Sequence, residues 1–139
     1  MIWGRFFWTT MHVAALGFPE VATDAVRQQY KDFFYNIGNA LPCSKCKANY
    51  ARHMNALPID LYLYDKNALF AWTVKFHNLV SKETGKNREW SVEEAMTFYS
   101  TGAYAAAAAK SSHDRGLVIL NVVLSVALVI AIVYIVKTR

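Results

Sequence analysis

The chain has 139 residues, of which 55% are hydrophobic and 18% charged. This length holds one domain and an appendage, which excludes large α/β barrels and two-domain cofactor enzymes. Fifteen lysines and arginines against ten acidic residues give a formal net charge of +5. Because the basic residues are scattered rather than gathered into a stripe, we expect no nucleic-acid partner.

The first predicted helix covers residues 3–14. Apolar and small residues recur there at intervals of three and four, which is typical of a helix with one buried face. Gly17, Phe18 and Pro19 end the pattern. The positions predicted to face the core are Trp3, Phe6, Phe7, Thr10, Met11 and Ala14.

Two further helices are predicted before residue 58. Thr23 or Asp24 can cap the second helix, which closes near Gly38. Pro42 fixes the backbone just before the third helix, predicted for residues 43–57, so that a Cys-x-x-Cys pair falls in its first turn.

The rest of the folded domain is predicted to be helical as well. After a connector at 58–64, Asp65 is expected to cap a long fourth helix that ends at Gly85. Ser91 and Glu94 have the spacing of a capping box, which opens a fifth helix. No segment shows convincing strand alternation. We therefore expect an all-α fold, a compact four- or five-helix bundle over residues 1–103.

The C-terminal part is predicted to be a membrane anchor. An alanine-rich stalk at 104–115 precedes an apolar segment at 116–136, and a short basic tail follows at 137–139. At about 1.5 Å per residue, the uncharged stretch 117–136 spans about 30 Å, the thickness of a bilayer core. A buried core helix, the alternative, normally has a polar face in so small a domain. Since three residues follow and no signal peptide precedes, we expect a tail anchor with a cytosolic domain.

The Cys-x-x-Cys pair has a physical reason to be redox-active. Cys43 and Cys46 are the only cysteines, and the amides of a helix start stabilise a thiolate there, as do two neighbouring lysines. The alternatives are two inert core thiols, or half a zinc site with His53 and His77. A closed zinc site needs a second ligand pair at comparable spacing, so we expect no metal.

Three motifs resemble one known family. Residues 4–12 resemble a Gly-Arg-x-x-Trp-x-x-x-His opening, 42–46 a Pro-Cys-x-x-Cys centre, and 77–86 a His-Asn-x-Val-Asn-x-x-x-Gly-Lys helix end. These are the motifs of the Erv/ALR flavin-linked sulfhydryl oxidases, and their order and approximate spacing agree from about residue 3 to residue 100.

The resemblance implies a helical bundle that holds FAD at its mouth, usually as a homodimer. Substrate thiols would reduce the disulfide, the dithiol would reduce the flavin, and O2 would reoxidise it to give H2O2. Cys46 would lie next to the flavin, and incoming thiolates would attack Cys43. The residues expected to bind the cofactor are Arg5, Trp8, His12, Tyr50, His77, Asn78, Val80, Ser81, Lys86 and Trp90.

Each of these residues also has an ordinary interpretation. Trp8 and His12 lie four apart on one helix face, and buried aromatic or histidine side chains are common in cores. Arg5 and Lys86 suit a pyrophosphate but are also typical solvated cations. Ser81 stands where the family has a second Asn. Because serine is shorter and has no amide, we expect its contact with the cofactor to be weaker or mediated by water.

The absence of a second Cys-x-x-Cys predicts how electrons arrive. A thiol-bearing substrate protein, or a thioredoxin-like carrier, would have to reduce the pair directly at Cys43. Compact versions of this kind resemble those of large cytoplasmic DNA viruses, which form disulfides in virion membrane proteins, so a viral or host internal membrane is the expected location. Two alternative functions stay open: a membrane-anchored helical adaptor without flavin, and a flavin-free dithiol carrier.

Overall fold

The computed structural model describes residues 3–86, 88–103 and 117–124. The chain divides into two compact units, residues 1–101 and residues 102–139. The first unit contains helices only, so the all-α prediction is confirmed for the described residues. Its elements are α1 (Trp3–Leu16), α2 (Asp24–Asn39), α3 (Ser44–Ala56), the 3-10 helix η1 (Ile59–Tyr62), α4 (Lys66–Glu83) and α5 (Val92–Ser100).

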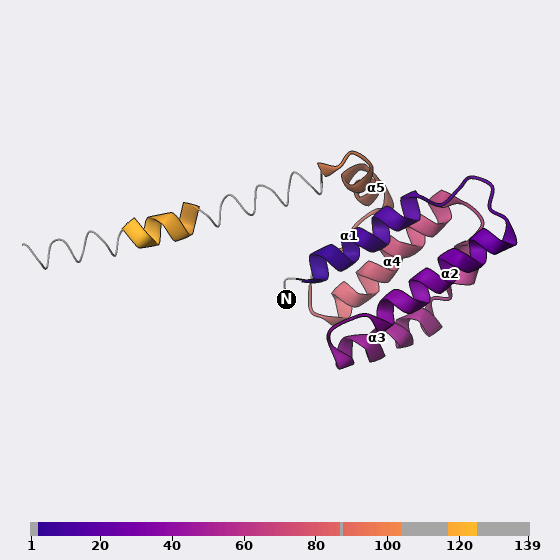
Figure 1. Ribbon diagram of the computed structural model, residues 1–139, viewed down its shortest axis with the longest axis horizontal. Coiled ribbons are helices and arrows are strands. Elements are labelled where there is room, and N and C mark those ends of the chain that lie inside the picture. The colour runs from indigo at the N-terminus through magenta and orange to yellow at the C-terminus, as the bar shows by residue number, and fades with distance from the viewer. Residues whose placement is uncertain (1–2, 87, 104–116, 125–139) are drawn as a thin grey trace, which may run out of the picture. The chain divides into compact units, whose positions relative to one another are not determined.

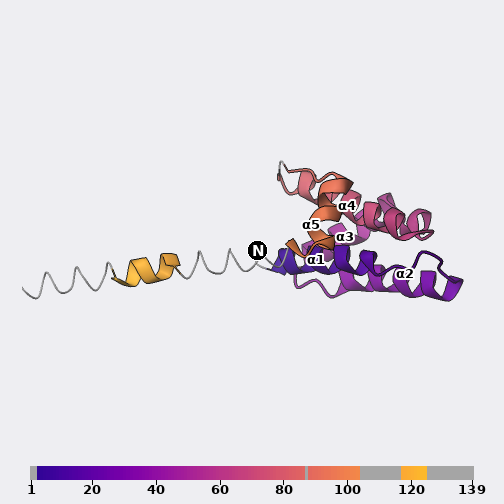
Figure 2. The same ribbon diagram turned by 90° about the horizontal axis from the view of Figure 1, so that it is seen from above.

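The helices of the first unit form two layers (Figures 1 and 2). Seen from above, α1 and α2 lie in one layer, and α3 and α4 lie in the other. α1 packs chiefly against α4, α2 packs against α3, and α5 contacts both α1 and α4. The start of α1, the start of α3 and the end of α4 therefore come together at one end of the bundle.

The helix starts are where capping residues predict them. Thr23, Asp65 and Ser91 each accept a hydrogen bond from the main-chain N–H three residues further on. Glu94 completes the capping box with the N–H of Ser91. These bonds satisfy amides that a helix start leaves without an internal partner.

Aromatic side chains fill the core between the two layers. Trp72, Phe34, Phe70 and Phe76 are fully buried. The indole Nε1 of Trp72 donates a hydrogen bond to the carbonyl of Leu57 over 3.0 Å, so its one polar atom is satisfied despite burial. Burial of such large side chains is the main source of stability in a bundle of this size.

The buried face predicted for α1 is partly wrong. Phe6 is 65% exposed and Thr10 is also exposed. Met11 is buried as predicted, and the inward face also includes His12 and Ala15. The spacing of apolar residues on α1 fits more than one face, and packing against both α4 and α5 decides which face turns inward.

Gly38 allows a close approach between α2 and α3. A Cβ atom at this position would overlap the ring of Tyr50. The phenol Oη of Tyr50 donates a 2.6 Å hydrogen bond to the carbonyl of Phe34, which pins the ring against α2. A side chain at Gly38 would therefore displace Tyr50.

In the second unit, residues 117–124 are helical. Within the ranges that the structure describes, no helix has both the length and the apolar character needed to cross a bilayer. The predicted stalk at 104–115, the basic tail at 137–139 and most of the predicted span at 116–136 lie outside these ranges.

Candidate active site

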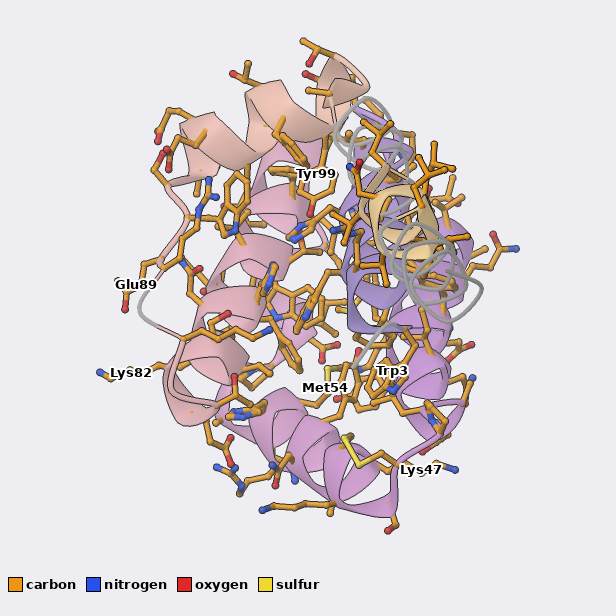
Figure 3. All side chains as sticks on the ribbon, turned by 90° about the vertical axis from the view of Figure 1, so that its left-hand side faces the viewer. Trp3, Lys47, Met54, Lys82, Glu89 and Tyr99 are labelled. Atoms are coloured by element: carbon orange, nitrogen blue, oxygen red, sulfur yellow. A yellow bond between two sulfur atoms is a disulfide. The ribbon has the colours of Figure 1, made fainter. Side chains whose placement is uncertain are left out.

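The cysteine pair closes the first turn of α3 as a disulfide between Cys43 and Cys46. Cys43 is the N-cap residue, and its Sγ accepts a 3.2 Å hydrogen bond from the N–H of Cys46. The same amide and the positive end of the helix dipole favour a thiolate on Cys43 once the bond is reduced. Figure 3 shows this sulfur–sulfur bond in yellow at the end of the bundle where Lys47 is labelled.

A cavity of about 290 Å³ opens beside Cys46. Its walls come from the start of α1, the start of α3 and the end of α4, and they are mostly aromatic or aliphatic. This volume is at the lower end of the range of small-molecule sites, and a few polar groups in an apolar wall are typical of such sites. The lining residues are Trp3, Gly4, Phe7, Trp8, Leu41, Cys46, Asn49, Tyr50, Val80, Thr84 and Lys86.

Five of the predicted site residues share this cavity: Trp8, Cys46, Tyr50, Val80 and Lys86. Cys43 is not among the lining residues. The two sulfurs therefore differ in surroundings, since one faces the cavity and the other caps the helix.

Sequence reasoning missed several cavity residues that helical spacing could have indicated. Asn49 follows Cys46 by three residues, and Thr84 follows Val80 by four, so each pair shares a helix face. Trp3 and Phe7 are likewise four residues apart on α1, with ring centroids 6.2 Å apart.

Gly4 keeps this cavity open. It lines the cavity, yet a Cβ atom added there would meet no heavy atom within 4 Å. The packing of the chain itself does not require glycine at this position. A Cβ atom at this position would therefore meet open space.

Trp8 links the cavity to a pair of histidines. Its ring stacks on the imidazole of His77, with centroids 4.0 Å apart and an interplanar angle of 6°. His12 lies behind this pair, and its Nε2 is 3.1 Å from Nδ1 of His77. Trp8, His12 and His77, which were predicted as site residues, thus form one contiguous cluster.

Both histidines are neutral at neutral pH. Burial lowers the pKa of His12 to about 3, with a smaller contribution from His77. Burial also lowers the pKa of His77 to about 4, and the charge of Lys86 adds to the effect. In the part of the chain that the structure describes, neither imidazole pairs with a carboxylate that would offset the loss of hydration on protonation.

Asn78 and Trp90 form a separate contact outside the cavity lining. Nδ2 of Asn78 donates to the carbonyl of Trp90 over 2.8 Å, and the N–H of Trp90 donates to Oδ1 of Asn78 over 3.0 Å. The guanidinium of Arg88 lies 4.0 Å from the centroid of the Trp90 ring. The Asn78 amide thus holds the segment between α4 and α5.

The end of α4 directs Lys86 to the cavity. The N–H of Lys86 donates to the carbonyl of Ser81 over 2.9 Å, and that of Gly85 donates to the carbonyl of Lys82. Gly85 has a φ of 71°, which suits glycine in this type of helix end. Ser81 is buried and Arg5 is exposed, and neither side chain is among the lining residues.

Glu83, the last residue of α4, connects this helix to α3. Its carboxylate accepts from Arg52 over 2.7 Å and Asn49 over 3.1 Å, and it lies 2.6 Å from Nε2 of the buried His53. The hydrogen bond from Arg52, and then that from His53, lowers the pKa of Glu83. His53 therefore belongs to a hydrogen-bonded network between α3 and α4 that also contains the ion pair of Arg52 and Glu83.

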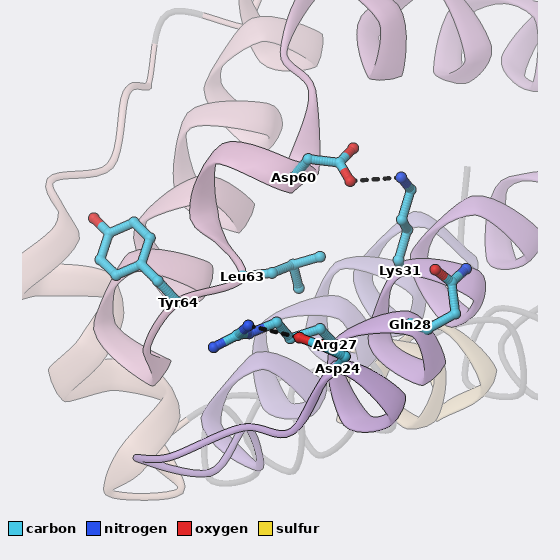
Figure 4. Close-up of a pocket in the computed structure, with 7 residues that line it drawn as sticks. All are labelled: Asp24, Arg27, Gln28, Lys31, Asp60, Leu63 and Tyr64. Atoms are coloured by element: carbon cyan, nitrogen blue, oxygen red, sulfur yellow. Dashed lines mark hydrogen bonds and ion pairs between the residues drawn. The ribbon is translucent and has the colours of Figure 1, made fainter.

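A second cavity, of about 430 Å³, lies between α2 and η1 (Figure 4). Its charged groups pair with one another: Arg27 with Asp24 over 2.9 Å, and Lys31 with Asp60 over 2.5 Å. Its described lining residues include no cysteine and no histidine, and the phenol of Tyr64 is their one hydroxyl group. The cavity at Cys46 is therefore the candidate active site.

These features define an α-helical domain that holds a redox-competent cysteine pair against an apolar, aromatic cavity. The Erv1 / Alr family profile matches residues 5–101, and the chain belongs to this family. The match covers the bundle except for the first two residues of α1, and it includes both cysteines.

Curated relatives agree with this assignment. A probable FAD-linked sulfhydryl oxidase of Acanthamoeba polyphaga mimivirus is 41% identical over 85 residues, which are 60% of this chain and 59% of that protein. The mitochondrial FAD-linked sulfhydryl oxidase ERV1 of Saccharomyces cerevisiae is 27% identical over 85 residues, or 60% of this chain and 43% of that protein. The match thus spans less than two thirds of each of these relatives.

Solved structures agree in fold. The FAD binding domain of Erv1 from Saccharomyces cerevisiae is similar with a TM-score of 0.65 at 22% identity, over 71% of this chain and 91% of that one. The yeast Erv1 core is similar with a TM-score of 0.63, over 69% of this chain and 79% of that one. The bundle therefore has the fold of this family.

Proposed function

We propose that the chain is a thiol oxidase that binds FAD in the cavity at Cys46 and makes disulfides in partner proteins. The observation that carries this proposal is a cysteine pair with one sulfur in the wall of an aromatic cavity. Relatives named as FAD-linked sulfhydryl oxidases support it.

The cavity residues fit a flavin. Trp8, Phe7 and Tyr50 offer flat apolar surfaces, Gly4 leaves room beside them, and Lys86 offers a positive charge at the rim. Since the cavity has only about 290 Å³, it suits a ring system, with the remainder of a dinucleotide outside it. Bound FAD would supply the two-electron acceptor for the reduced cysteine pair, and O2 would take up these electrons as H2O2.

The protein's own part is thiol–disulfide exchange. A substrate thiolate attacks Sγ of Cys43, the Cys43–Cys46 bond breaks, and Cys46 leaves as a thiolate at the cavity wall. A second substrate thiolate then attacks the mixed disulfide and releases Cys43. Two substrate thiols have become one disulfide, and the pair holds the two electrons.

The environment of each sulfur suits this division. Cys43 caps α3, where the N–H of Cys46 stabilises it as a leaving thiolate in the second exchange. Cys46 faces the cavity, so its electrons arrive next to the proposed cofactor position. A thiol-bearing substrate or a thioredoxin-like carrier would approach from the Cys43 side.

Purification of the full chain tests the proposal. We expect a yellow protein with the visible absorption of flavin, which loses its colour with dithiothreitol in the absence of air and consumes O2 with the formation of H2O2 in air. A colourless folded protein without disulfide exchange would instead support the flavin-free adaptor. A colourless protein that exchanges disulfides but forms no peroxide would support the dithiol carrier.

The membrane anchor is a further part of the proposal. Residues 117–124 are helical and their large apolar side chains are exposed, which supports the interpretation of 116–136 as a membrane segment. We expect the full chain to resist alkaline extraction from membranes and its domain to be cleaved by protease added on the cytosolic side. The viral relatives support a viral or host internal membrane as the location.

We propose in addition that two copies pair through the outer face of α1 and α2. A groove of about 370 Å³ lies there, lined by Val13, Ala14, Gly17, Gln29, Tyr30 and Phe33. Val13 and Phe33 are 39% and 37% exposed. Light scattering should give the mass of a dimer, and Phe33→Lys should give that of a monomer. Tyr35→Lys, on the same helix outside the groove, is the matched control.

A further inference from the structure

The hydrogen bonds behind Trp8 form a chain with a defined direction. It runs from α4 to α1 and back: the carbonyl of Phe70, the hydroxyl of Thr73, the imidazole of His12 and the imidazole of His77. The consecutive distances are 2.7 Å, 2.8 Å and 3.1 Å. Thr73 and His12 are buried, and both histidines were assigned to the site through Trp8.

The direction of the first bond sets the proton arrangement of the whole chain. The Thr73 hydroxyl has one proton and two neighbours that could accept it, the carbonyl of Phe70 at 2.7 Å and Nδ1 of His12 at 2.8 Å. The carbonyl can only accept, and the direction of the shorter contact is from Thr73 to Phe70. With its proton in that bond, Thr73 Oγ1 has no further proton to offer, and Nδ1 of His12 is the donor in the 2.8 Å contact of this arrangement. His12 thus carries its proton on Nδ1.

The state of His77 follows from that of His12. Neutral His12 with a proton on Nδ1 has a bare Nε2, which accepts from Nδ1–H of His77 over 3.1 Å. Neutral His77 is then left with a bare Nε2 of its own. Burial and the nearby charge of Lys86 both keep His77 neutral, as its lowered pKa indicates.

This last nitrogen is accessible to a ligand. No contact within the described part of the chain engages Nε2 of His77. No buried side-chain nitrogen or oxygen there lacks a hydrogen-bond partner, so this unengaged atom must reach the surface. The imidazole around it is stacked on Trp8, a wall of the cavity.

We propose that Thr73 is a positioning residue that fixes the proton arrangement of His12 and His77, so that Nε2 of His77 acts as an acceptor for an N–H or O–H group of the bound cofactor. Thr73 itself lies two side chains away from the ligand. The role in ligand binding rests on the proposed flavin site, whereas the proton arrangement is a property of the chain alone.

Histidine NMR of the ligand-free full chain tests the proton arrangement directly. With 15N-labelled histidine, we expect both His12 and His77 to show a protonated Nδ1 and a bare Nε2. In Thr73→Val, which has the same shape without the hydroxyl, Nδ1–H of His12 would lose its buried acceptor. Its proton should move to Nε2, and His77 should then carry its proton on Nε2 as well.

The same variants test the effect on the cofactor. Thr73→Val turns the acceptor on His77 into a donor, so we expect FAD affinity to fall at least about tenfold, the effect of one lost buried hydrogen bond. Thr73→Ser keeps the hydroxyl and should retain both the wild-type tautomers and the affinity. Thr10→Val is the matched control, because Thr10 makes the same type of bond to the carbonyl of Phe6 but has no histidine partner.

The results separate the inference from the proposed function. A proton on Nε2 of His77 in the wild type would overturn the inference, as would an unchanged tautomer in Thr73→Val. Should Thr73→Val not fold, the wild-type and Thr73→Ser spectra decide the proton arrangement. If the tautomers are as expected and no FAD binds, the proposed function fails while the hydrogen-bond chain stands.

Discussion

The cavity at Cys46 and the cavity at Lys31 belong to the same helical bundle but differ in their walls. The first has about 290 Å³ and is lined mainly by aromatic and aliphatic side chains around one sulfur. The second is larger, about 430 Å³, and its wall holds two ion pairs. Cavity volume alone would select the second cavity as the candidate active site. The chemistry of the walls separates the two cavities. The candidate active site has a reactive sulfur in apolar surroundings, whereas the charges of the second cavity are already paired with one another.

The largest expected effect concerns the sulfurs. Cys46→Ser and Cys43→Ser should each abolish O2 consumption with dithiothreitol, because neither single thiol can form the intramolecular disulfide. Both variants should retain bound FAD, since serine is close in shape to cysteine. Oxygen-electrode traces and the visible spectrum measure the two properties on the same sample. Robust turnover in either variant would contradict the exchange mechanism.

The next largest effect concerns the contact between Gly38 and Tyr50, a residue that lines the cavity at Cys46. Gly38→Ala gains up to about 1 kcal/mol in helix propensity, but its Cβ atom overlaps the pinned ring of Tyr50. Overpacking costs about 1–3 kcal/mol, so we expect a net loss of stability in urea unfolding together with weaker FAD binding. Adding Tyr50→Leu, which removes the overlapping ring, should recover part of the stability. A fully additive pair would show that the overlap does not matter.

Gly4 offers a way to separate folding from binding. Gly4→Leu places a side chain in the cavity where no heavy atom lies within 4 Å. We expect FAD affinity to fall about tenfold or more while the thermal stability of the FAD-free protein is unchanged or slightly higher. Gln28→Leu puts the same side chain into the wall of the charged cavity, and there the affinity should not change. Equal affinities in the two variants would remove the functional distinction between the cavities.

A smaller, graded effect is expected with pH. Unfolded histidine has a pKa of about 6.5, whereas folding lowers that of His77 to about 4 and that of His12 to about 3. Between pH 6.5 and 4 the unfolded chain binds protons that the folded chain does not, so stability falls as the pH falls, by up to about 1.4 kcal/mol per pH unit for each histidine. Above pH 6.5 these two groups contribute no slope.

Urea unfolding at several pH values measures this slope, and His12→Gln should reduce it. Glu83, whose pKa is also lowered, contributes a further loss of stability only below its ordinary pKa of about 4.3. A wild-type stability that is flat between pH 6.5 and 4.5 would contradict neutral buried histidines.

The helices of this bundle could be predicted well because their starts are local. Asp65 predicts the start of α4, and the pair of Ser91 and Glu94 predicts the start of α5. The structure contains both caps. The exposure of Phe6 could not be predicted, because the inward face of α1 depends on where α4 and α5 pack. A periodic pattern shows that a helix has a buried face but does not choose between two adjacent candidates.

The sequence motifs named some residues of the candidate site but not their arrangement. The motifs named Trp8 and His77, yet their stacking joins positions 69 residues apart in sequence, and no local pattern reports the 4.0 Å between the rings. Asn78 and Trp90 were predicted to touch the cofactor, and in the described structure the side-chain amide of Asn78 bonds to the main-chain N–H and carbonyl of Trp90. Such pairings arise from the packing of whole helices.

The smallest expected effect tests the charged cavity itself. Lys31→Met removes the partner of Asp60 but keeps most of the length of the side chain. Asp60 is exposed, so water can replace the lost ion pair, and exposed pairs of this kind contribute little to stability. Neither FAD binding nor turnover with dithiothreitol should change, because the described lining residues of this cavity include none of those at the cavity of Cys46. A clear change in turnover with a protein substrate, but not with dithiothreitol, would instead reveal that the partner docks on this face, and the contrast between the two cavities would then be one between a reaction site and a recognition site.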